Sequence, residues 1–288
     1  MRFAYHKQKF QDWFTQQWIL VWGKRIDPEK VPWLMGPFGK SDWISDEFVK
    51  ELAQDEGLVI ERDVKSQGLI PSIELLGLSE DELEKLSNHV IEFYQNTSEY
   101  DLELFVRWNP LFKVLGYFVK ILFSKRIDQL NIPTESISSS KEISSEIITL
   151  TDPDSEEIKY TIWYRTFKTT GQVLYSGVYS TCILPTGQSC IKAVFPLPKG
   201  NATVIMSPTV GRNGELQLYS SGKKFGDPGF YFLLEDSKGD LWAQYIRSFR
   251  DILIVTSDKE KVSAEQTLTL WNKEVVRFNY EIDHKSRT

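Results

Sequence analysis

The sequence predicts an α+β fold, with a mainly helical region followed by a large antiparallel β-domain. From Glu146 onward nearly every segment is rich in β-branched and aromatic residues, and clusters of Gly, Asn, Asp, Ser and Pro separate the segments. Most of these turns lie about 13 residues apart, which is typical of consecutive antiparallel strands and not of βαβ units. Aromatic residues make up 13% of the chain, so large side chains are available for a core.

We divide the 288 residues into three parts. Residues 1–135 form the mainly helical region, where the apolar spacing predicts an amphipathic helix over 8–22 and a short helix over 45–55. Residues 136–145 are rich in serine and poor in large apolar side chains, which predicts an exposed linker. Residues 146–288 form the β-domain.

A capping box marks the clearest helix of the first part. The Ser79 hydroxyl can accept a hydrogen bond from the backbone N–H of Glu82, and the Glu82 carboxylate can reach back to Ser79. The apolar residues that follow share one face, so we expect a helix over 80–95. Tyr100–Trp108 alternates as a strand does, but Phe105 breaks the alternation and leaves this segment ambiguous.

A second strong helix is expected to begin at Asn109, with Pro110 at its first position, and to end near Arg126. Its first part, Pro110–Phe123, is apolar apart from two lysines. The helix can be buried against the β-domain, can close the mouth of a ligand-holding barrel, or can lie in a membrane interface. Burial is favoured, and peripheral membrane contact through Pro110–Phe123 is not.

The β-domain is expected to be a barrel or a strongly curled sheet of about ten strands, because an open sheet of that size curls or closes. A two-layer sandwich is the second choice. The expected strands are 146–151, 157–168, 172–183, 189–196, 202–209, 215–220, 229–235, 240–249, 251–257, 262–270 and 274–282.

The segment Phe230–Phe249 is expected to be a β-hairpin, and the same strand–turn–strand unit recurs through the β-domain. Asp236 and Gly239 favour its turn, because an Asp side chain can hydrogen-bond to its own backbone and Gly readily adopts a positive φ. One face of its second strand carries Leu241, Ala243, Tyr245, Arg247 and Phe249.

The charge distribution argues against nucleic-acid binding. The net charge of −6 arises entirely in residues 1–140, and residues 141–288 carry none, so neither half has a basic surplus for a phosphate backbone. The N-terminus has no secretory signal, and no window of about 18 apolar residues predicts a membrane span. A cytoplasmic location follows by default.

Motifs for catalysis, metals or cofactors are missing from the sequence. His6, His89 and His284 are scattered, and there is no CxxC, HExxH or GxSxG. The stretch Gly36–Ser41 ends like a phosphate-binding loop, but Leu34 stands where that loop needs glycine. We therefore assign no catalytic residue, no metal ligand and no cofactor.

Cys182 and Cys190 flank an expected hairpin turn, and their pairing depends on its length. A two-residue loop, Thr186 and Gly187, places them diagonally. A three-residue loop that adds Pro185 makes them face each other, close enough for a disulfide. Two structural thiols are the favoured interpretation.

The candidate ligand-binding residues lie on the hairpin and on the longest turn. If the face of Arg247 points inward, its charge needs an anion from the protein or from the head group of a ligand; if the face points outward, Arg247 is ordinary surface. Lys223 and Lys224 lie in a loop that suits a phosphate or carboxylate, although a plain connector is favoured. The candidates are Tyr245, Arg247, Phe249, Lys223 and Lys224.

These patterns favour a non-enzymatic binding protein. The expected architecture resembles calycin-type barrels, and this resemblance of shape implies an interior that holds a hydrophobic or amphipathic small molecule or a lipid. One alternative is a cofactor-free enzyme that uses carboxylate, Tyr and Arg groups. A carboxylate of raised pKa near Tyr or Arg would be evidence for this alternative. Another is a structural protein that docks through its helical half. The sequence leaves the oligomeric state open.

Overall fold

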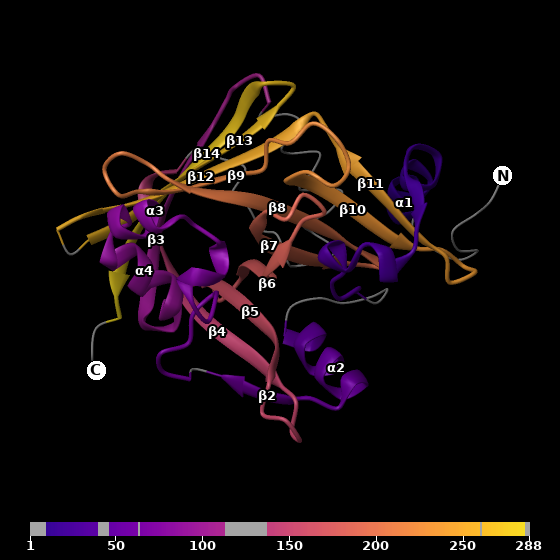
Figure 1. Ribbon diagram of the computed structural model, residues 1–288, viewed down its shortest axis with the longest axis horizontal. Helices are drawn as coiled ribbons and strands as arrows, with labels where there is room; N and C mark the ends of the chain where they lie inside the picture. The colour runs from indigo at the N-terminus through magenta and orange to yellow at the C-terminus, as the bar shows by residue number, and fades with distance from the viewer. Residues whose placement is uncertain (1–9, 40–45, 63, 113–136, 260, 286–288) are drawn as a thin grey trace.

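The computed structural model describes residues 10–39, 46–62, 64–112, 137–259 and 261–285. It is a closed antiparallel β-barrel of ten strands that carries a few N-terminal helices and extra strands (Figure 1). The predicted fold class is confirmed, and the barrel rather than the sandwich is observed. The strand order around the ring is β8-β7-β6-β5-β4-β3-β14-β13-β12-β9 and back to β8.

Most expected strands agree closely with the observed ones. The ring consists of β3 (Tyr100–Trp108), β4 (Ile137–Thr151), β5 (Ile158–Phe167), β6 (Val173–Ile183), β7 (Ser189–Leu197), β8 (Gly200–Val210), β9 (Leu216–Tyr219), β12 (Phe249–Asp258), β13 (Lys261–Leu270) and β14 (Lys273–His284). Outside the ring lie β1 (Lys24–Ile26), β2 (Val59–Arg62), β10 (Gly229–Glu235) and β11 (Leu241–Ile246).

The ring closes because one edge of β8 serves two partners. The first half of β8, up to Ile205, pairs with β10, and its second half, from Ser207, pairs with the short strand β9. On its other edge β9 pairs with β12. The hairpin of β10 and β11 therefore leaves the barrel as a flap, to which β1 adds an outer strand.

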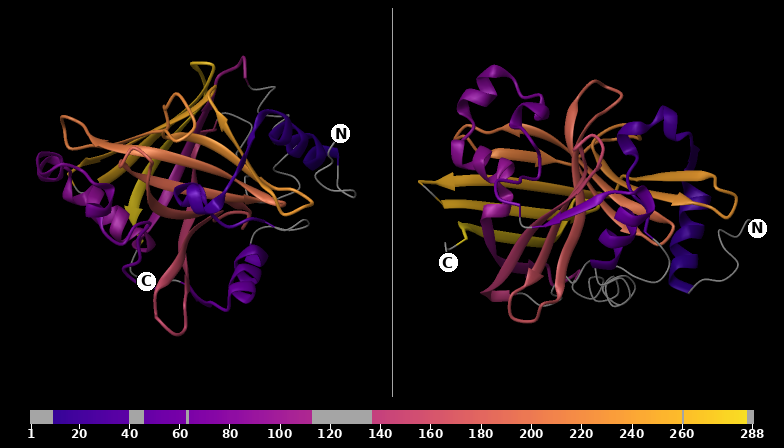
Figure 2. Two further views of the ribbon diagram at one scale, coloured as in Figure 1. Left: turned by 45° about the vertical axis from the view of Figure 1, so that its right-hand side comes forward. Right: turned by 90° about the horizontal axis from the view of Figure 1, so that it is seen from below.

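The helices cover the barrel at separate places (Figure 2). α1 (Phe10–Trp22) packs Ile19 against Leu234 of the flap. α2 (Asp46–Glu56) packs against the outer face of β4 to β7. The short helices η1 (Pro28–Lys30) and η2 (Pro32–Leu34) precede α2 in the chain, and η3 (Ile73–Leu76), α3 (Glu80–Lys85), α4 (Asn88–Gln95) and η4 (Thr97–Glu99) follow it.

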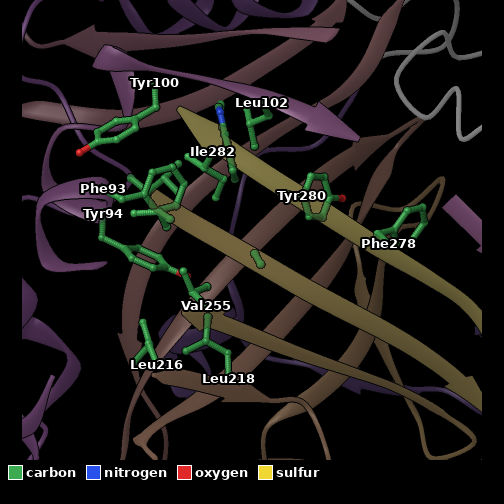
Figure 3. Close-up of a cluster of buried hydrophobic side chains, with 14 of the residues drawn as sticks. Phe93, Tyr94, Tyr100, Leu102, Leu216, Leu218, Val255, Phe278, Tyr280 and Ile282 are labelled. Carbon is green, nitrogen blue, oxygen red and sulfur yellow. The ribbon is translucent and has the colours of Figure 1, made fainter. Parts of the chain in front are cut away.

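A cover formed by residues 67–76 and by α4 sits over one end of the barrel. Side chains of this cover belong to the same buried cluster as the inner faces of the strands. Figure 3 shows Phe93 and Tyr94 extending from α4 towards Val255 and Ile282 on the strands. We call this segment the α4 cover.

A strap over residues 31–39 crosses the outer face of the barrel. The buried Lys192 ammonium donates to the carbonyl oxygen of Met35 at 2.7 Å. The Asn201 amide donates to the carbonyl oxygens of Gly36 and Pro37, both at 3.3 Å. A Cβ at Gly36 would lie 2.8 Å from a methyl group of Val194, so only glycine lets the strap approach this closely.

The expected helix over 80–95 is two helices. Ser79 and Glu82 form the capping box as predicted and start α3. The backbone then turns extended at Leu86 and Ser87, and the Ser87 N–H donates to the carbonyl of Gly214 at 3.1 Å. The turn between β8 and β9 therefore takes the hydrogen bond that a continuous helix needs, which a pattern of neighbouring residues cannot reveal.

The serine-rich segment 136–145 is not a linker, because β4 starts at Ile137 and runs through it. The small side chain of Ser145 lies against a large ring: its hydroxyl accepts a hydrogen bond from the indole nitrogen of Trp163 at 2.8 Å. The ambiguous segment Tyr100–Trp108 is the strand β3, and it pairs with β4 across the boundary expected between the domains.

The expected helix from Asn109 to Arg126 lies outside the described residues from position 113 onward. At its start, the Asn109 side chain accepts from the backbone N–H of Leu111 at 3.1 Å, and the Phe112 N–H donates to the Asn109 carbonyl. The predicted cap therefore forms a turn directly after β3.

Barrel closure gives a first testable prediction. Leu218 of β9 is 1% exposed and faces the interior, so Leu218→Ala should lower the free energy of unfolding by about 2–5 kcal/mol through lost burial and a new cavity. Leu111→Ala removes the same atoms from a side chain that is 87% exposed, and should change it by less than about 0.5 kcal/mol. Urea unfolding followed by circular dichroism measures both. Equal effects would contradict the buried position of β9.

Candidate functional site

The barrel interior contains a cavity of about 80 Å³ beneath the α4 cover. Most of its lining is aromatic or aliphatic, and it includes Phe93 and Tyr94. Three polar side chains interrupt this lining: Arg165 of β5, Asp251 of β12 and Gln266 of β13. Strand alternation places them there, since each side chain shares a face with inward residues two positions away.

Asp251 is the most unusual group in the cavity wall. It is 4% exposed, and its Oδ2 accepts a hydrogen bond from the Gln266 amide at 2.7 Å. Its Oδ1 is buried and accepts no hydrogen bond from the described residues. Burial raises the pKa of the Asp251 carboxyl to about 7, and the hydrogen bond from Gln266 opposes the rise. The group therefore exchanges its proton near neutral pH.

Neighbouring groups fix the position of Asp251. Its backbone N–H donates to the Ser220 hydroxyl at 2.6 Å, and its carbonyl accepts from the Ser220 N–H at 2.9 Å. The Tyr280 hydroxyl donates to the other end of the Gln266 amide at 3.4 Å. Burial raises the pKa of Tyr280, so this phenol stays protonated and acts as a donor.

Arg165 is the cationic residue among the described residues that line the cavity. It is 5% exposed, and its guanidinium carbon lies 3.9 Å from the ring centre of Trp163, within the range of a cation–π contact. Its Nη2 donates to the Tyr179 hydroxyl at 3.3 Å. Burial raises the pKa of Tyr179, and the Arg165 charge opposes the rise.

The α4 cover closes the cavity at the end where β3 begins. The Leu69 N–H donates to the carbonyl of Tyr94 at 2.9 Å. At Gly68 a Cβ would lie 2.2 Å from the Tyr94 carbonyl oxygen, so two backbone segments of the cover touch and require glycine there. Because Leu69, Phe93 and Tyr94 line the cavity, its size depends on how this cover sits.

The site as a whole is a small, mostly apolar cavity with hydrogen-bonding groups in its wall. Asp251 can accept a hydrogen bond through Oδ1, and it can take or give a proton near pH 7. Among the described residues there is no group of three or more His, Cys, Asp or Glu placed to hold a metal ion. These residues can support recognition of a small molecule and proton transfer.

The structure does not bring the five predicted site residues into this cavity. Tyr245 lies in a separate cluster on the flap, where its hydroxyl donates to the Pro228 carbonyl at 3.3 Å. Arg247 is exposed in the turn between β11 and β12, where the strand alternation ends. The Phe249 ring packs edge-to-face against Phe230 at 4.8 Å, two positions before Asp251 on the same strand.

Lys223 and Lys224 are exposed in the loop before β10. Their backbone N–H groups donate to the Asp227 carboxylate at 2.9 and 3.1 Å, which holds the loop in shape. Lys223 also lines a polar surface groove of about 290 Å³ together with residues of the β6–β7 turn and of β8. A ligand role for these five residues stays a prediction.

Sequence reasoning missed Arg165, Asp251 and Gln266. Arg165 had a usable signal, because it alternates with Trp163 and Phe167 in a strand whose other face is also apolar. Asp251 lies two positions after Phe249 and is followed by the apolar and β-branched residues Ile252–Val255, which also marks a carboxylate on an inward face. No local signal connects Asp251 to Gln266, because the strand register joins them.

Cys182 and Cys190 face each other in the register of β6 and β7, with a three-residue loop between Leu184 and Gln188. This is the second of the two alternatives that the sequence left open. Both are free thiols in the structure, and burial raises the pKa of Cys182 to about 11 and that of Cys190 to about 12. They are therefore poor nucleophiles near neutral pH.

Comparison with known proteins identifies a distant relative. The chain is 24% identical over 274 residues to a Bacillus subtilis (strain 168) protein described as "Uncharacterized membrane protein YndJ". The similarity covers 93% of this chain and 46% of that protein, so the chain spans about half the length of the relative. No protein-family model matches the chain. No solved structure matches it either.

This similarity contradicts the cytoplasmic location expected by default, because the similar protein is described as a membrane protein. The expectation relied on the lack of a signal or span in the sequence, which does not determine where a chain works. Within the described part of the chain, every helix is too short or too polar to span a bilayer.

The pKa of Asp251 gives a second prediction. An acid whose pKa is higher in the folded than in the unfolded chain stabilises the fold fully below its unfolded value, near 3.9, and that stability is lost as the pH rises through about 7. Between pH 5.5 and 8 the wild-type protein should therefore lose about 2 kcal/mol of unfolding free energy from this group. Asp251→Asn should remove this part of the pH dependence.

Urea unfolding at several pH values measures the effect. Asp227→Asn is a matched control, because it changes an aspartate outside the cavity and should keep the wild-type slope above pH 5.5. If wild type and Asp251→Asn show the same slope from pH 5.5 to 8, Asp251 ionises as an ordinary carboxylate and the cavity is not its environment.

Proposed function

We propose that the barrel is a binding domain for a small amphipathic molecule, which it holds in the interior cavity below the α4 cover. The observation that carries this proposal is the buried Asp251 Oδ1, which has no hydrogen-bond donor among the described residues although it lies in the wall of a cavity. Buried polar groups are nearly always paired, so a ligand that brings a donor removes a free-energy penalty.

The size of the cavity supports a small ligand. At about 80 Å³ it is well below the roughly 300–1,000 Å³ of pockets for drug-sized ligands, and about half of a 150 Å³ cavity that accommodates benzene. A lipid chain fits only after a large movement of the α4 cover. Within the binding hypothesis, the geometry therefore favours a short molecule over a lipid.

The chemistry of the wall supports a head group that donates a hydrogen bond. An alcohol or amine can donate to Asp251 Oδ1, while its apolar body contacts residues such as Leu102, Val255 and Ile282. Because Asp251 titrates near pH 7, an amine should bind better as the pH rises and the carboxylate forms.

We also propose that this domain works at a membrane. The support is the similarity to the Bacillus subtilis protein described as a membrane protein, which the chain matches over about half of that protein's length. In this proposal the barrel is the part that recognises a small molecule.

A cofactor-free enzyme is the second candidate, because a carboxylate of raised pKa lies near Tyr and Arg side chains. Asp251, with a pKa of about 7, suits a general acid or base at neutral pH. Native mass spectrometry with organic extraction separates the two candidates. A binding protein returns its co-purified molecule unchanged after incubation, whereas an enzyme releases a product of different mass.

A series of size-matched probes tests the binding proposal. Propylamine, 1-propanol and propionate have nearly the same volume but differ in the head group. Propylamine and 1-propanol should shift the NMR methyl signals of Val255 and Ile282 with dissociation constants in the millimolar range, as expected for so few atoms. Propionate should shift them much less, since its carboxylate meets the Asp251 carboxylate.

Three variants sharpen the test. Asp251→Asn should remove the preference for the amine and its strengthening above pH 7, while Asp227→Asn should leave both unchanged. Ala193→Leu fills the cavity and should abolish binding of all three probes, with thermal unfolding showing that the variant is folded. Preferential binding of propionate would overturn the proposal, because the head group of the ligand would then interact with Arg165 and not with Asp251.

A further inference from the structure

Three turns meet at the end of the barrel opposite to the α4 cover. The Trp271 N–H donates to the Ser248 carbonyl at 2.8 Å, which joins the β13–β14 turn to the β11–β12 turn. Asn109 donates from its backbone to the Val275 carbonyl at 3.0 Å and from its side chain to the Glu274 carbonyl at 2.8 Å. These bonds place the turn after β3 beside the other two. We call residues 107–112, 247–250 and 270–277 the three-turn end.

Large apolar side chains point into solvent at this end. Leu111 is 87% exposed and Trp271 is 69% exposed, whereas Val275 and Val276 at the start of β14 are buried. Trp271 and Asn272 both have positive φ, 49° and 60°, which is uncommon for a bulky residue. Figure 1 shows the β13–β14 turn and the end of β3 side by side at the top of the molecule. The backbone thus holds an indole at the tip of a hairpin instead of in the core.

The three-turn end is also basic. It contains five cationic residues and one carboxylate, a net charge of +4 in a chain whose net charge is −6, and one of the cations, Arg277, also pairs with Glu265 outside it at 3.1 Å. The carboxylate, Glu274, accepts from Arg277 at 2.6 Å and lies 3.5 Å from Arg107. Arg247 and Lys273 are exposed beside Trp271. Exposed apolar tips surrounded by cations are complementary to a surface that is apolar inside and anionic at its rim.

We propose that the three-turn end docks on an anionic lipid bilayer, with Trp271 and Leu111 entering the interface and Arg247 and Lys273 facing the lipid phosphates. This inference rests on the proposal that the chain works at a membrane, and it is independent of the ligand in the cavity. Indole rings favour the level of the lipid head groups, and each Lys or Arg near an anionic leaflet adds to the attraction. The opposite charge of the remaining surface gives the barrel one preferred orientation.

Co-sedimentation of the full chain with lipid vesicles tests this orientation. The wild-type protein should bind phosphatidylcholine vesicles that contain about 30 mol% phosphatidylglycerol, should bind pure phosphatidylcholine weakly, and should release as salt increases. The double variant Arg247→Glu and Lys273→Glu should reduce the partition coefficient by about tenfold or more. Trp271→Ala should reduce it by about threefold.

Trp22→Ala is the matched control, because Trp22 is 72% exposed on α1, away from the three-turn end, and also precedes cations in sequence. It should leave vesicle binding unchanged, and thermal unfolding verifies that each variant is folded. The proposal is overturned by equal binding to both vesicle types, by a charge reversal without effect, or by a Trp22→Ala loss as large as that of Trp271→Ala.

Propylamine binding measured on the same samples separates this inference from the proposed ligand site. Variants of the three-turn end should bind propylamine as the wild type does, since none of these residues lines the cavity. If the wild-type protein binds propylamine but not the vesicles, only the docking proposal is contradicted. If it binds the vesicles but not propylamine, only the proposed ligand site is contradicted.

Discussion

The structure depends on the closure of the sheet by β9, a strand of four residues. β9 pairs with the second half of β8 on one edge and with β12 on the other, so the ring has no free edge at this point. Closure excludes water from the inner faces of the strands, and it does so for polar and apolar side chains alike. The burial that holds Leu216 and Leu218 in the core therefore also raises the pKa of Asp251.

Local patterns predicted most of this barrel, because alternation and turn chemistry are properties of neighbouring residues. They could not predict that β8 divides one edge between β9 and β10, since this depends on segments distant in sequence. The two errors in secondary structure have the same origin. Ser145 belongs to a strand because it accepts a hydrogen bond from Trp163, and the helix breaks near Ser87 because Gly214 takes its N–H. In both places a long-range partner outweighs the local preference.

The candidate site was harder to predict than the fold for a related reason. Alternation tells which residues share a face, but it does not tell which face is enclosed. Arg247 continues the pattern of its strand in sequence, yet the strand ends at Ile246 and the side chain is exposed. Arg165 follows an equivalent pattern and is buried, because β5 lies within the ring and α2 covers its other face. Position in the barrel, and not residue pattern, separates the two arginines.

The strands β3 and β14 connect the two ends of the barrel, with the α4 cover of the ligand cavity at one end and the three-turn end at the other. Tyr100 at the start of β3 stacks on His284 at the end of β14, next to the α4 cover, whereas Trp108 and Lys273 mark the other ends of these strands at the three-turn end. A barrel that docks through Trp271 therefore turns its α4 cover away from the bilayer. A ligand that passes the cover then arrives from water and not from the lipid phase. This agrees with a cavity of about 80 Å³ that suits a short molecule with a polar head better than a lipid chain.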